Sequence, residues 1–258
     1  MQALQIAASG MMAQQRNTEV VANNLANMNT TGYQRRRTEF ADLIYVNSNR
    51  EPSVSSQAGK IVPGGVQSGL GVSMAAVYRV QEQGSLSSTS NTFDMAIQGN
   101  GFFQVLLPNG DTAYTRDGTF QLNGQGDLVT HDGFAVQPAL NIPPEAIDVT
   151  INSSGEVLVL TAGDRAAKAV GTLQIATFPN GAGLEALGDN LFKESKASGP
   201  ANVAAPGTTG LGTVLQGFVE TSNVDPIEEI AALIAAQRAY EMNSKVIQTA
   251  DQMMAPNR

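Results

Sequence analysis

The chain has 258 residues, 42% of them hydrophobic, and a formal net charge of −8. The length allows one large or two medium domains, and negative charge spread without long runs argues against a general nucleic-acid binder. Cysteine is absent, which excludes disulfides and thiolate metal sites.

The chain has no sequence feature that predicts membrane insertion or secretion through a cleaved signal. No stretch approaches 18 consecutive apolar residues, the length of a membrane-spanning helix. The start, MQALQIAASGMMAQQ, lacks the basic segment of a secretory signal peptide. If the protein leaves the cytoplasm, we expect it to use another route.

The first 28 residues predict a long, weakly apolar helix. Its apolar positions recur three and four residues apart, as in a coiled coil. They form a seam that includes Leu4, Met11, Val21, Leu25 and Met28. Many seam neighbours are small, and Gly10 weakens the helix by about 1 kcal/mol relative to alanine. We therefore expect this end to be poorly ordered in an isolated monomer.

An asparagine-rich run follows the apolar part of this helix. Asn23, Asn24, Asn27 and Asn29 carry amides that both donate and accept hydrogen bonds. Such side chains can cap a helix end or bridge two subunits. Gly32 is suited to end the helix in a left-handed conformation.

The middle of the chain is rich in glycine and turn residues and predicts short strands. Residues 47–71 are polar and Ser/Gly/Pro-rich, typical of a long loop or extended hairpin. DG and NG turns then separate short apolar runs, a pattern typical of an antiparallel β domain. The predicted strands are 72–80, 95–97, 102–107, 113–115, 120–122, 128–130, 134–137, 149–152, 156–160 and 169–178. Residues 195–212 predict a loop, and 211–221 a last extended segment.

The C-terminal end predicts a second long helix over Pro226–Met254. Asp225 is a candidate N-cap and Pro226 suits a first turn. At about 1.5 Å per residue the helix would be roughly 43 Å long. Its seam, again with 3-4 spacing, includes Leu233, Tyr240, Ile247 and Met254.

These elements predict an α+β fold. Long N- and C-terminal helices form a coiled-coil-like pair, with an inserted antiparallel all-β domain and an extended linking hairpin. The expected domains are a terminal helical domain (1–35 and 224–258), a linker and hairpin region (36–92 and 205–223) and a β domain (93–204). Two roles for the helices remain open: they assemble with copies from other molecules, or they cover the central sheet.

No motif in the sequence predicts catalysis, a cofactor or a metal. The single histidine, His131, lies in a predicted turn, and HExxH, GxSxG and Walker A sequences are absent. Asn123–Asp127 does not satisfy the calcium-loop pattern and predicts a hairpin turn. The basic run Arg35–Arg37 lacks the interleaved aromatics of a nucleic-acid patch, so a solvated face or charge pairing is expected.

Several motifs resemble those of the bacterial flagellar rod and hook protein family. The first is SGM at 9–11, followed by ANNLANMNTTGY at 22–33, which contains Leu25 and Gly32. GSLSSTSN at 84–91 resembles the family segment G-x-L-x-x-T-x-N. The next motifs contain Asp94, Gly101, Phe102, Phe103, Arg116, Asp117 and Gly118. The last are ETSNV and QRAYE, which contain Asn223, Gln237, Arg238, Tyr240 and Glu241. The resemblance spans essentially the whole chain. Phe93 before Asp94 departs mildly from the leucine usual in the family.

Within the family, the resemblance is to the distal-rod members. Hook proteins have a much larger middle, and proximal-rod proteins are usually shorter or lack the Ser/Gly/Pro insertion. Here residues 47–65, with Asn47, Pro52, Pro63 and Gly65, occupy the place of the stretch that the family uses to keep the rod straight. The local sequence of this stretch diverges from the family.

The resemblance implies a structural subunit of the flagellar basal-body rod. Such subunits form a helical tube of identical copies, with the terminal helices inside around an export channel and the β domain outside. The implied partners are proximal-rod proteins, the hook protein, the P- and L-ring proteins and the flagellar type III export apparatus. The implied location is the periplasm-spanning rod, reached without a cleaved signal peptide.

Other functions remain open alongside this one. A proximal-rod or hook protein of the same family is the nearest alternative. A secreted β-domain adhesin or enzyme would predict clustered titratable residues in a pocket. A cytoplasmic binding module would predict a stable monomer with ordered ends.

Overall fold

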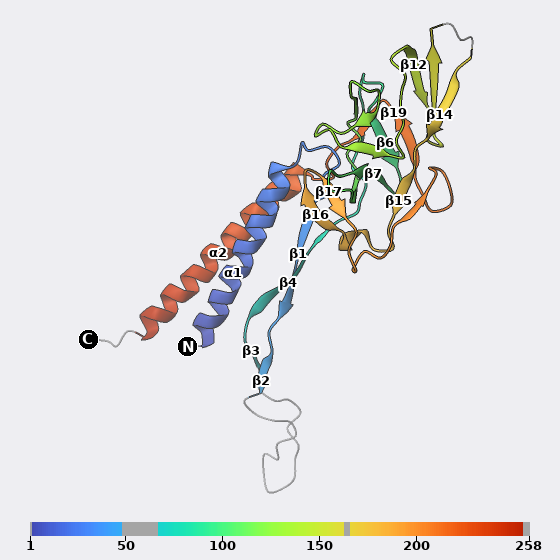
Figure 1. Cartoon of the computed structure of the whole chain (residues 1–258). Coiled ribbons are helices and arrows are strands. Elements are labelled where there is room, and N and C mark those ends of the chain that lie inside the picture. Colours follow the sequence, from blue (N-terminus) through green and yellow to red (C-terminus); the bar gives the residue numbers. More distant parts are fainter. Residues whose placement is uncertain (1, 48–66, 163–165, 255–258) are drawn as a thin grey trace. The chain divides into compact units, whose positions relative to one another are not determined.

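The computed structural model describes residues 2–47, 67–162 and 166–254. The fold is α+β, with an N-terminal helix, a central antiparallel β region and a C-terminal helix (Figure 1). The chain divides into two compact units, one of residues 1–26, 36–78 and 225–258, the other of residues 27–35 and 79–224. The three domains predicted from the sequence stay a prediction.

The first unit contains the two long helices, α1 (Gln2–Ala26) and α2 (Pro226–Met254). α2 has the bounds that the sequence predicts. Asp225 caps it, because its Oδ1 accepts the Ile227 amide at 2.8 Å. The helices lie side by side and run in opposite directions (Figure 1). Gly10 faces Asn243 and, further along both helices, Asn24 contacts Glu229.

The prediction for the end of α1 is wrong. The helix ends at Ala26, so Met28 lies beyond it and is exposed. At residues 27–30, the Thr30 amide donates to the Asn27 carbonyl at 3.1 Å and the two side chains bond at 3.2 Å, forming a turn. Asn and Thr compete with helix formation in this way. Gly32 is left-handed as predicted, with φ +68°, but is not the helix cap.

The first unit also contains two short strand pairs. β1 (Arg36–Asp42) pairs with β4 (Val72–Arg79), whose last residue belongs to the second unit, and β2 (Tyr45–Asn47) pairs with β3 (Gln67–Gly69). The Thr38 hydroxyl donates to Asn17 of α1 at 2.7 Å, which places this ribbon against the helix. The structure describes no other residues between Asn47 and Gln67.

The second unit is built from antiparallel sheets. Strand order in its large sheet is β16-β17-β8-β7-β11-β10-β9, and β15 pairs with both β7 and β18. Smaller sheets are β12-β13-β14, β6-β19 and β5-β20. The strands are β5 (Leu86–Ser88), β6 (Met95–Gln98), β7 (Phe102–Leu106), β8 (Thr112–Thr115), β9 (Gln121–Leu122), β10 (Leu128–Val129), β11 (Ala135–Gln137), β12 (Ala146–Ile151), β13 (Glu156–Thr161), β14 (Lys168–Thr172), β15 (Ile175–Thr177), β16 (Glu185–Gly188), β17 (Leu191–Lys193), β18 (Asn202–Ala204), β19 (Thr213–Gln216) and β20 (Phe218–Glu220). A short 3-10 turn, η1, spans Gly181–Gly183.

One predicted strand is divided in the structure. Residues 169–178 form β14 and β15, which belong to different sheets. Between them, the buried Leu173 donates its amide to the Gly155 carbonyl at 2.7 Å and places its side chain in the core. The run of apolar residues is the same for one strand or two, so the sequence could not reveal the break. The predicted loop 195–212 likewise contains β18.

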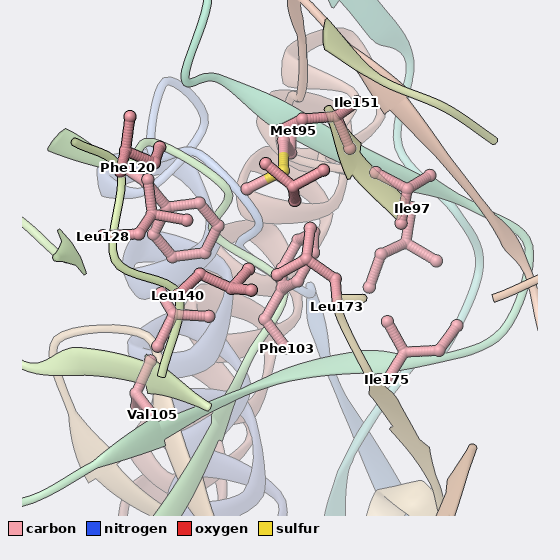
Figure 2. Packing of buried hydrophobic residues seen from close by; sticks show 14 of the residues in the cluster. Met95, Ile97, Phe103, Val105, Phe120, Leu128, Leu140, Ile151, Leu173 and Ile175 are labelled. Atoms are coloured by element: carbon pink, nitrogen blue, oxygen red, sulfur yellow. The ribbon is translucent and has the colours of Figure 1, made fainter. Parts of the chain in front are cut away.

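The core of the second unit lies between its sheets. Figure 2 shows Phe103, Met95, Ile97 and Leu173 packed together. The ring of Phe103 meets that of Phe120 edge to face, with centroids 5.1 Å apart. Adjacent strand residues point to opposite faces, so Phe102 packs in a second cluster with Phe178 and Phe192. The phenylalanine pair of the sequence motif thus fills both faces of β7.

Candidate assembly site

The family motifs of the second unit meet at a buried ion pair. Arg116 follows β8 and Glu220 ends β20, and both side chains are almost fully buried. Arg116 Nη2 lies 2.8 Å from Glu220 Oε2. Arg116 Nη1 donates to the carbonyls of Gly99 and Gly101 at 2.8 and 2.7 Å. One guanidinium therefore links three motifs that are far apart in the sequence. We call Arg116, Glu220 and the two glycine carbonyls the motif node.

Burial and charge act in opposite directions at this node. Burial raises the pKa of Glu220, while Arg116 and the Gly84 amide, 3.1 Å from Oε1, lower it. Burial likewise lowers the pKa of Arg116, and Glu220 opposes that shift. Each charge is therefore stable in this place only because the other is present.

Asp117 and Gly118, the next motif residues, shape the turn after Arg116. Asp117 Oδ1 accepts the Thr119 amide at 3.0 Å and its hydroxyl at 2.8 Å. Burial raises the pKa of Asp117. A Cβ on Gly118 would lie 1.6 Å from the Met95 carbonyl oxygen, so only glycine fits. Asp94, another motif residue, pairs with Thr119 in an isolated β-bridge.

Asn223 and Gly32 link the chain segments around the node through hydrogen bonds. The Gly32 amide donates to the Glu220 carbonyl at 2.8 Å. Asn223 Oδ1 accepts the Arg35 amide at 2.7 Å, and its Nδ2 donates to the carbonyls of Val80 and Glu82 at 3.1 and 2.9 Å. One amide side chain thus joins three segments of the second unit.

In the first unit, Asn24 performs a similar role. Its side chain is buried, with 1% of its surface exposed. It accepts the Arg36 amide and donates to the Arg36 carbonyl, both at 2.8 Å, as a neighbouring strand would. It also donates to Glu229 of α2 at 3.2 Å. Asn24 therefore joins α1, α2 and β1.

The predicted seam stays a prediction, but its residues differ in burial. Ala7, Val21, Ala236 and Ala250 are buried. The larger seam residues are half-buried: Leu4, Met11, Leu25, Leu233 and Ile247. Tyr240 remains 45% exposed, and the Met254 side chain lies outside the described residues. The buried positions are thus mostly small residues, and the larger ones keep part of their surface exposed.

Several motif residues on the helices face solvent. Asn23, Gln237, Arg238 and Glu241 are exposed. Gln237, Tyr240 and Glu241 line an open groove of about 630 Å³ between α1 and α2, together with Gln15 and Glu19 of α1. Asn27 is half-buried and Asn29 exposed in the turn after α1.

Other predicted residues fall outside this arrangement. Asn47 ends β2, and Pro52, Pro63 and Gly65 lie outside the described residues. His131 is in a turn as predicted, its Nε2 3.1 Å from Asp132. Asn123 Oδ1 accepts the amides of Gln125 and Asp127, which confirms the predicted hairpin turn.

Within residues 2–47, 67–162 and 166–254, no group of His, Asp and Glu side chains could hold a metal ion. None of the helices in those ranges has both the length and the apolar character needed to cross a membrane.

Comparison with known proteins identifies the family. Three family models match the chain: "Flagella basal body rod protein" over residues 4–34, "Flagellar hook protein FlgE/F/G D1 domain" over 96–159 and "Flagellar basal body rod FlgEFG protein C-terminal" over 215–255. The flagellar basal-body rod protein FlgG of Caulobacter vibrioides is 57% identical over 98% of this chain and 97% of its own. The chain belongs to the flagellar basal-body rod protein family.

More distant relatives extend the same family. FlgG of Agrobacterium fabrum is 50% identical over 98% of this chain and 97% of its own. The flagellar hook-basal body complex protein FlhP of Bacillus subtilis is 31% identical over 93% and 92%. The residues matched by the three family models include the motif node and most of the two helices.

The sequence singled out most of the node residues as family motifs, but not their role. In the sequence, Glu220 is marked only as the first residue of the ETSNV motif. The signal that could have found it is a lone carboxylate in an otherwise apolar extended segment, which needs a buried cation.

Proposed function

We propose that this chain is a structural subunit of the flagellar distal rod. It assembles with its own copies into a helical tube that transmits motor torque to the hook and carries the export channel. The observation that carries the proposal is near full-length similarity to FlgG rod proteins, up to 57% identity. The chain acts by packing, and we infer no catalytic activity and no cofactor.

In this proposal, the paired helices form a coiled-coil-like inner layer of the tube. The support is the packing of α1 against α2 and the burial of small residues such as Ala7 and Ala236. Exposed apolar residues on α2, such as Ile227 and Met242, support it as well. Apolar surface on several sides of a helix indicates further helix partners. The motif node stiffens the second unit, which we call the β unit and which forms the outer layer.

The proposed neighbours and location follow from the same function. We infer contacts with proximal-rod proteins below, the hook protein above and the P- and L-ring proteins around the rod. The subunit reaches the periplasm-spanning rod through the flagellar type III export apparatus without a cleaved signal. The nearest alternative function is a proximal-rod subunit, because family members share the helical ends.

Genetic replacement tests the function. A strain lacking this chain should be non-motile and make basal bodies without a distal rod, and the wild-type chain should restore both. Leu25→Asp and Ile247→Asp each place a charge among half-buried seam residues. Both should abolish rod assembly while the purified protein keeps its β signal in circular dichroism. Gln248→Asp, on an exposed neighbour, should restore motility.

Electron microscopy of the basal bodies decides the outcome. Rods that are complete without the chain would refute the distal-rod proposal. A rod truncated at its base would favour the proximal-rod alternative. Normal motility in both seam variants would leave the rod function in place and refute the seam.

A further inference from the structure

The β unit contains a pocket rich in side-chain amides. The pocket lies beside the motif node and has a volume of about 520 Å³. Among the described residues that line it, only Arg116 is charged, and that charge is paired with Glu220. A carboxamide both donates and accepts hydrogen bonds, so the pocket suits an uncharged polar ligand. We call it the amide pocket, and five of its lining residues carry a carboxamide: Gln34, Gln81, Gln83, Asn100 and Asn202.

Gln34 brings a buried amide to this pocket. Only 8% of the surface of Gln34 is exposed, and its side chain makes no hydrogen bond to any residue that the structure describes. The main chain on both sides is fixed, because Asn223 bonds to the Tyr33 carbonyl at 3.4 Å and to the Arg35 amide at 2.7 Å. Buried amides normally have a hydrogen-bond partner. The Gln34 amide therefore indicates that the pocket receives a ligand.

Other carboxamides of the β unit show what such a group binds in this fold. Gln83 accepts the Gly99 amide at 3.0 Å and donates to the Ile97 carbonyl at 2.7 Å. Gln216 makes the same pair of bonds to β12, at 2.8 and 2.7 Å. In both cases one carboxamide bonds the N–H of one residue and the C=O of the residue two positions earlier. These two groups face the same side of an extended chain, so the carboxamide binds it as a neighbouring strand would.

An extended polypeptide fits the amide pocket better than a sugar does. Its main chain is uncharged and offers one donor and one acceptor at nearly every residue. A sugar ring would need an open aromatic face on which to stack. Phe102 is only 8% exposed, and the half-buried Phe178 already meets the rings of Phe102 and Tyr114 edge to face, with centroids 5.9 and 4.8 Å away. Recognition in this pocket therefore falls to the carboxamides.

We infer that the amide pocket binds an uncharged, extended segment of another polypeptide. Gln34 bonds the main chain of that segment as Gln83 bonds the chain at Gly99. Gln81 is exposed at the pocket and has no hydrogen bond within the described chain, so it supplies a second carboxamide. The segment is uncharged because Arg116 is already paired and leaves no counter-charge for an acidic side chain. This binding site goes beyond the proposed function, which does not depend on it.

Photo-cross-linking tests the site in the assembled protein. A photoreactive benzoylphenylalanine replaces Pro179, which is exposed, lines the pocket and leaves all five carboxamides in place. The chain is expressed in the strain lacking it, the cells are irradiated, and mass spectrometry maps the adduct in isolated basal bodies. We expect an adduct on an uncharged polypeptide segment, whose sequence tells whether it belongs to a second copy of this chain or to a different protein.

Gln34→Met separates binding from folding. It should lower the yield of the adduct by about tenfold, because the segment loses its bonds to the buried amide. It should leave urea unfolding of the purified chain unchanged, because this amide has no partner among the described residues. Gln121→Met is the matched control, since Gln121 is exposed and lies outside the pocket; it should change neither measurement.

The other outcomes overturn the inference. An adduct on a glycan would assign the pocket to a sugar. No adduct, or one that Gln34→Met leaves unchanged, would show that water alone fills the pocket. Destabilisation by Gln34→Met as large as that of a bonded amide would show that Gln34 has a structural role. Complete rods in each of these cases would leave the rod function intact, whereas basal bodies that never contain this chain would refute the proposed function itself.

Discussion

Replacement of Arg116 by methionine tests whether the motif node holds the β unit together. Methionine keeps much of the apolar stem of the side chain and removes the charged guanidinium group. Glu220 then stays buried without a cation, and the Gly99 and Gly101 carbonyls lose their donor. Breaking a buried ion pair by removing one partner costs about 3–5 kcal/mol. For a unit of roughly 150 residues, this lowers the melting temperature by about 6–20 °C.

The stability that Arg116→Met loses should depend on pH in a defined direction. Burial raises the pKa of folded Glu220 above its unfolded value, so the stability that Glu220 contributes is present below pH 4.5 and is lost as the pH rises through the folded pKa. In the wild type, the charge of Arg116 opposes this rise in the pKa of Glu220. The Arg116→Met variant lacks that charge. The stability difference between wild type and variant should therefore be larger at pH 7 than at pH 5.

The assay is thermal and urea unfolding of the purified chain, followed by circular dichroism of the β unit at both pH values. Arg16→Met is the control, because Arg16 forms an exposed ion pair with Glu19 at 3.1 Å. Such a pair contributes less than about 1 kcal/mol. If Arg116→Met loses no more than the control, or loses equally at both pH values, the node is not a stabilising buried ion pair.

Three further changes test other parts of the molecule. Asn223→Ala removes three hydrogen bonds and should lower the unfolding free energy of the β unit by about 1–3 kcal/mol, measured by urea unfolding. Gln121→Ala, at an exposed position, is the control and should leave the unfolding free energy unchanged. Gly10→Leu should abolish motility, because even a Cβ at this position would lie 2.8 Å from the Asn243 amide. Gly10→Ala should keep motility, because a small shift of the flexible Asn243 side chain makes room for one methyl group. Deletion within residues 47–65, most of which lie outside the described residues, should leave the β unit folded and give curved or hook-like rods in electron micrographs; straight rods would show that rigidity lies elsewhere.

The sequence predicted the elements better than their connections. α2 was predictable to the residue because Asp225 and Pro226 mark its start. The turns at Asn123 and His131 were predictable because NG and DG dipeptides favour few conformations. The end of α1 was not, because an asparagine-rich run suits a helix end and a turn equally well.

Long-range pairing left no local mark in the sequence. The apolar segment around Glu220 indicates that its carboxylate needs a cation, but nothing in the sequence identifies Arg116 as that cation. Only the fold brings the two side chains together and buries them. Asn24 is similar: four asparagines stand in one run, yet one of them is buried against Arg36 and Glu229. Whether a polar residue is buried depends on which distant segment packs against it. Local sequence patterns do not predict that packing.

The family motifs separate into two physical groups once the fold is known. Arg116, Gly118 and Asn223 are explained inside the subunit. Arg116 and Asn223 each bond to several chain segments, and the position of Gly118 has no room for a Cβ. Gln237 and Glu241 are exposed, and the described part of the chain gives their side chains no hydrogen bond or ion pair. A specific residue pattern that folding does not require points to contacts made outside the folded subunit. We therefore expect a helix of a neighbouring subunit to bind in the groove between α1 and α2.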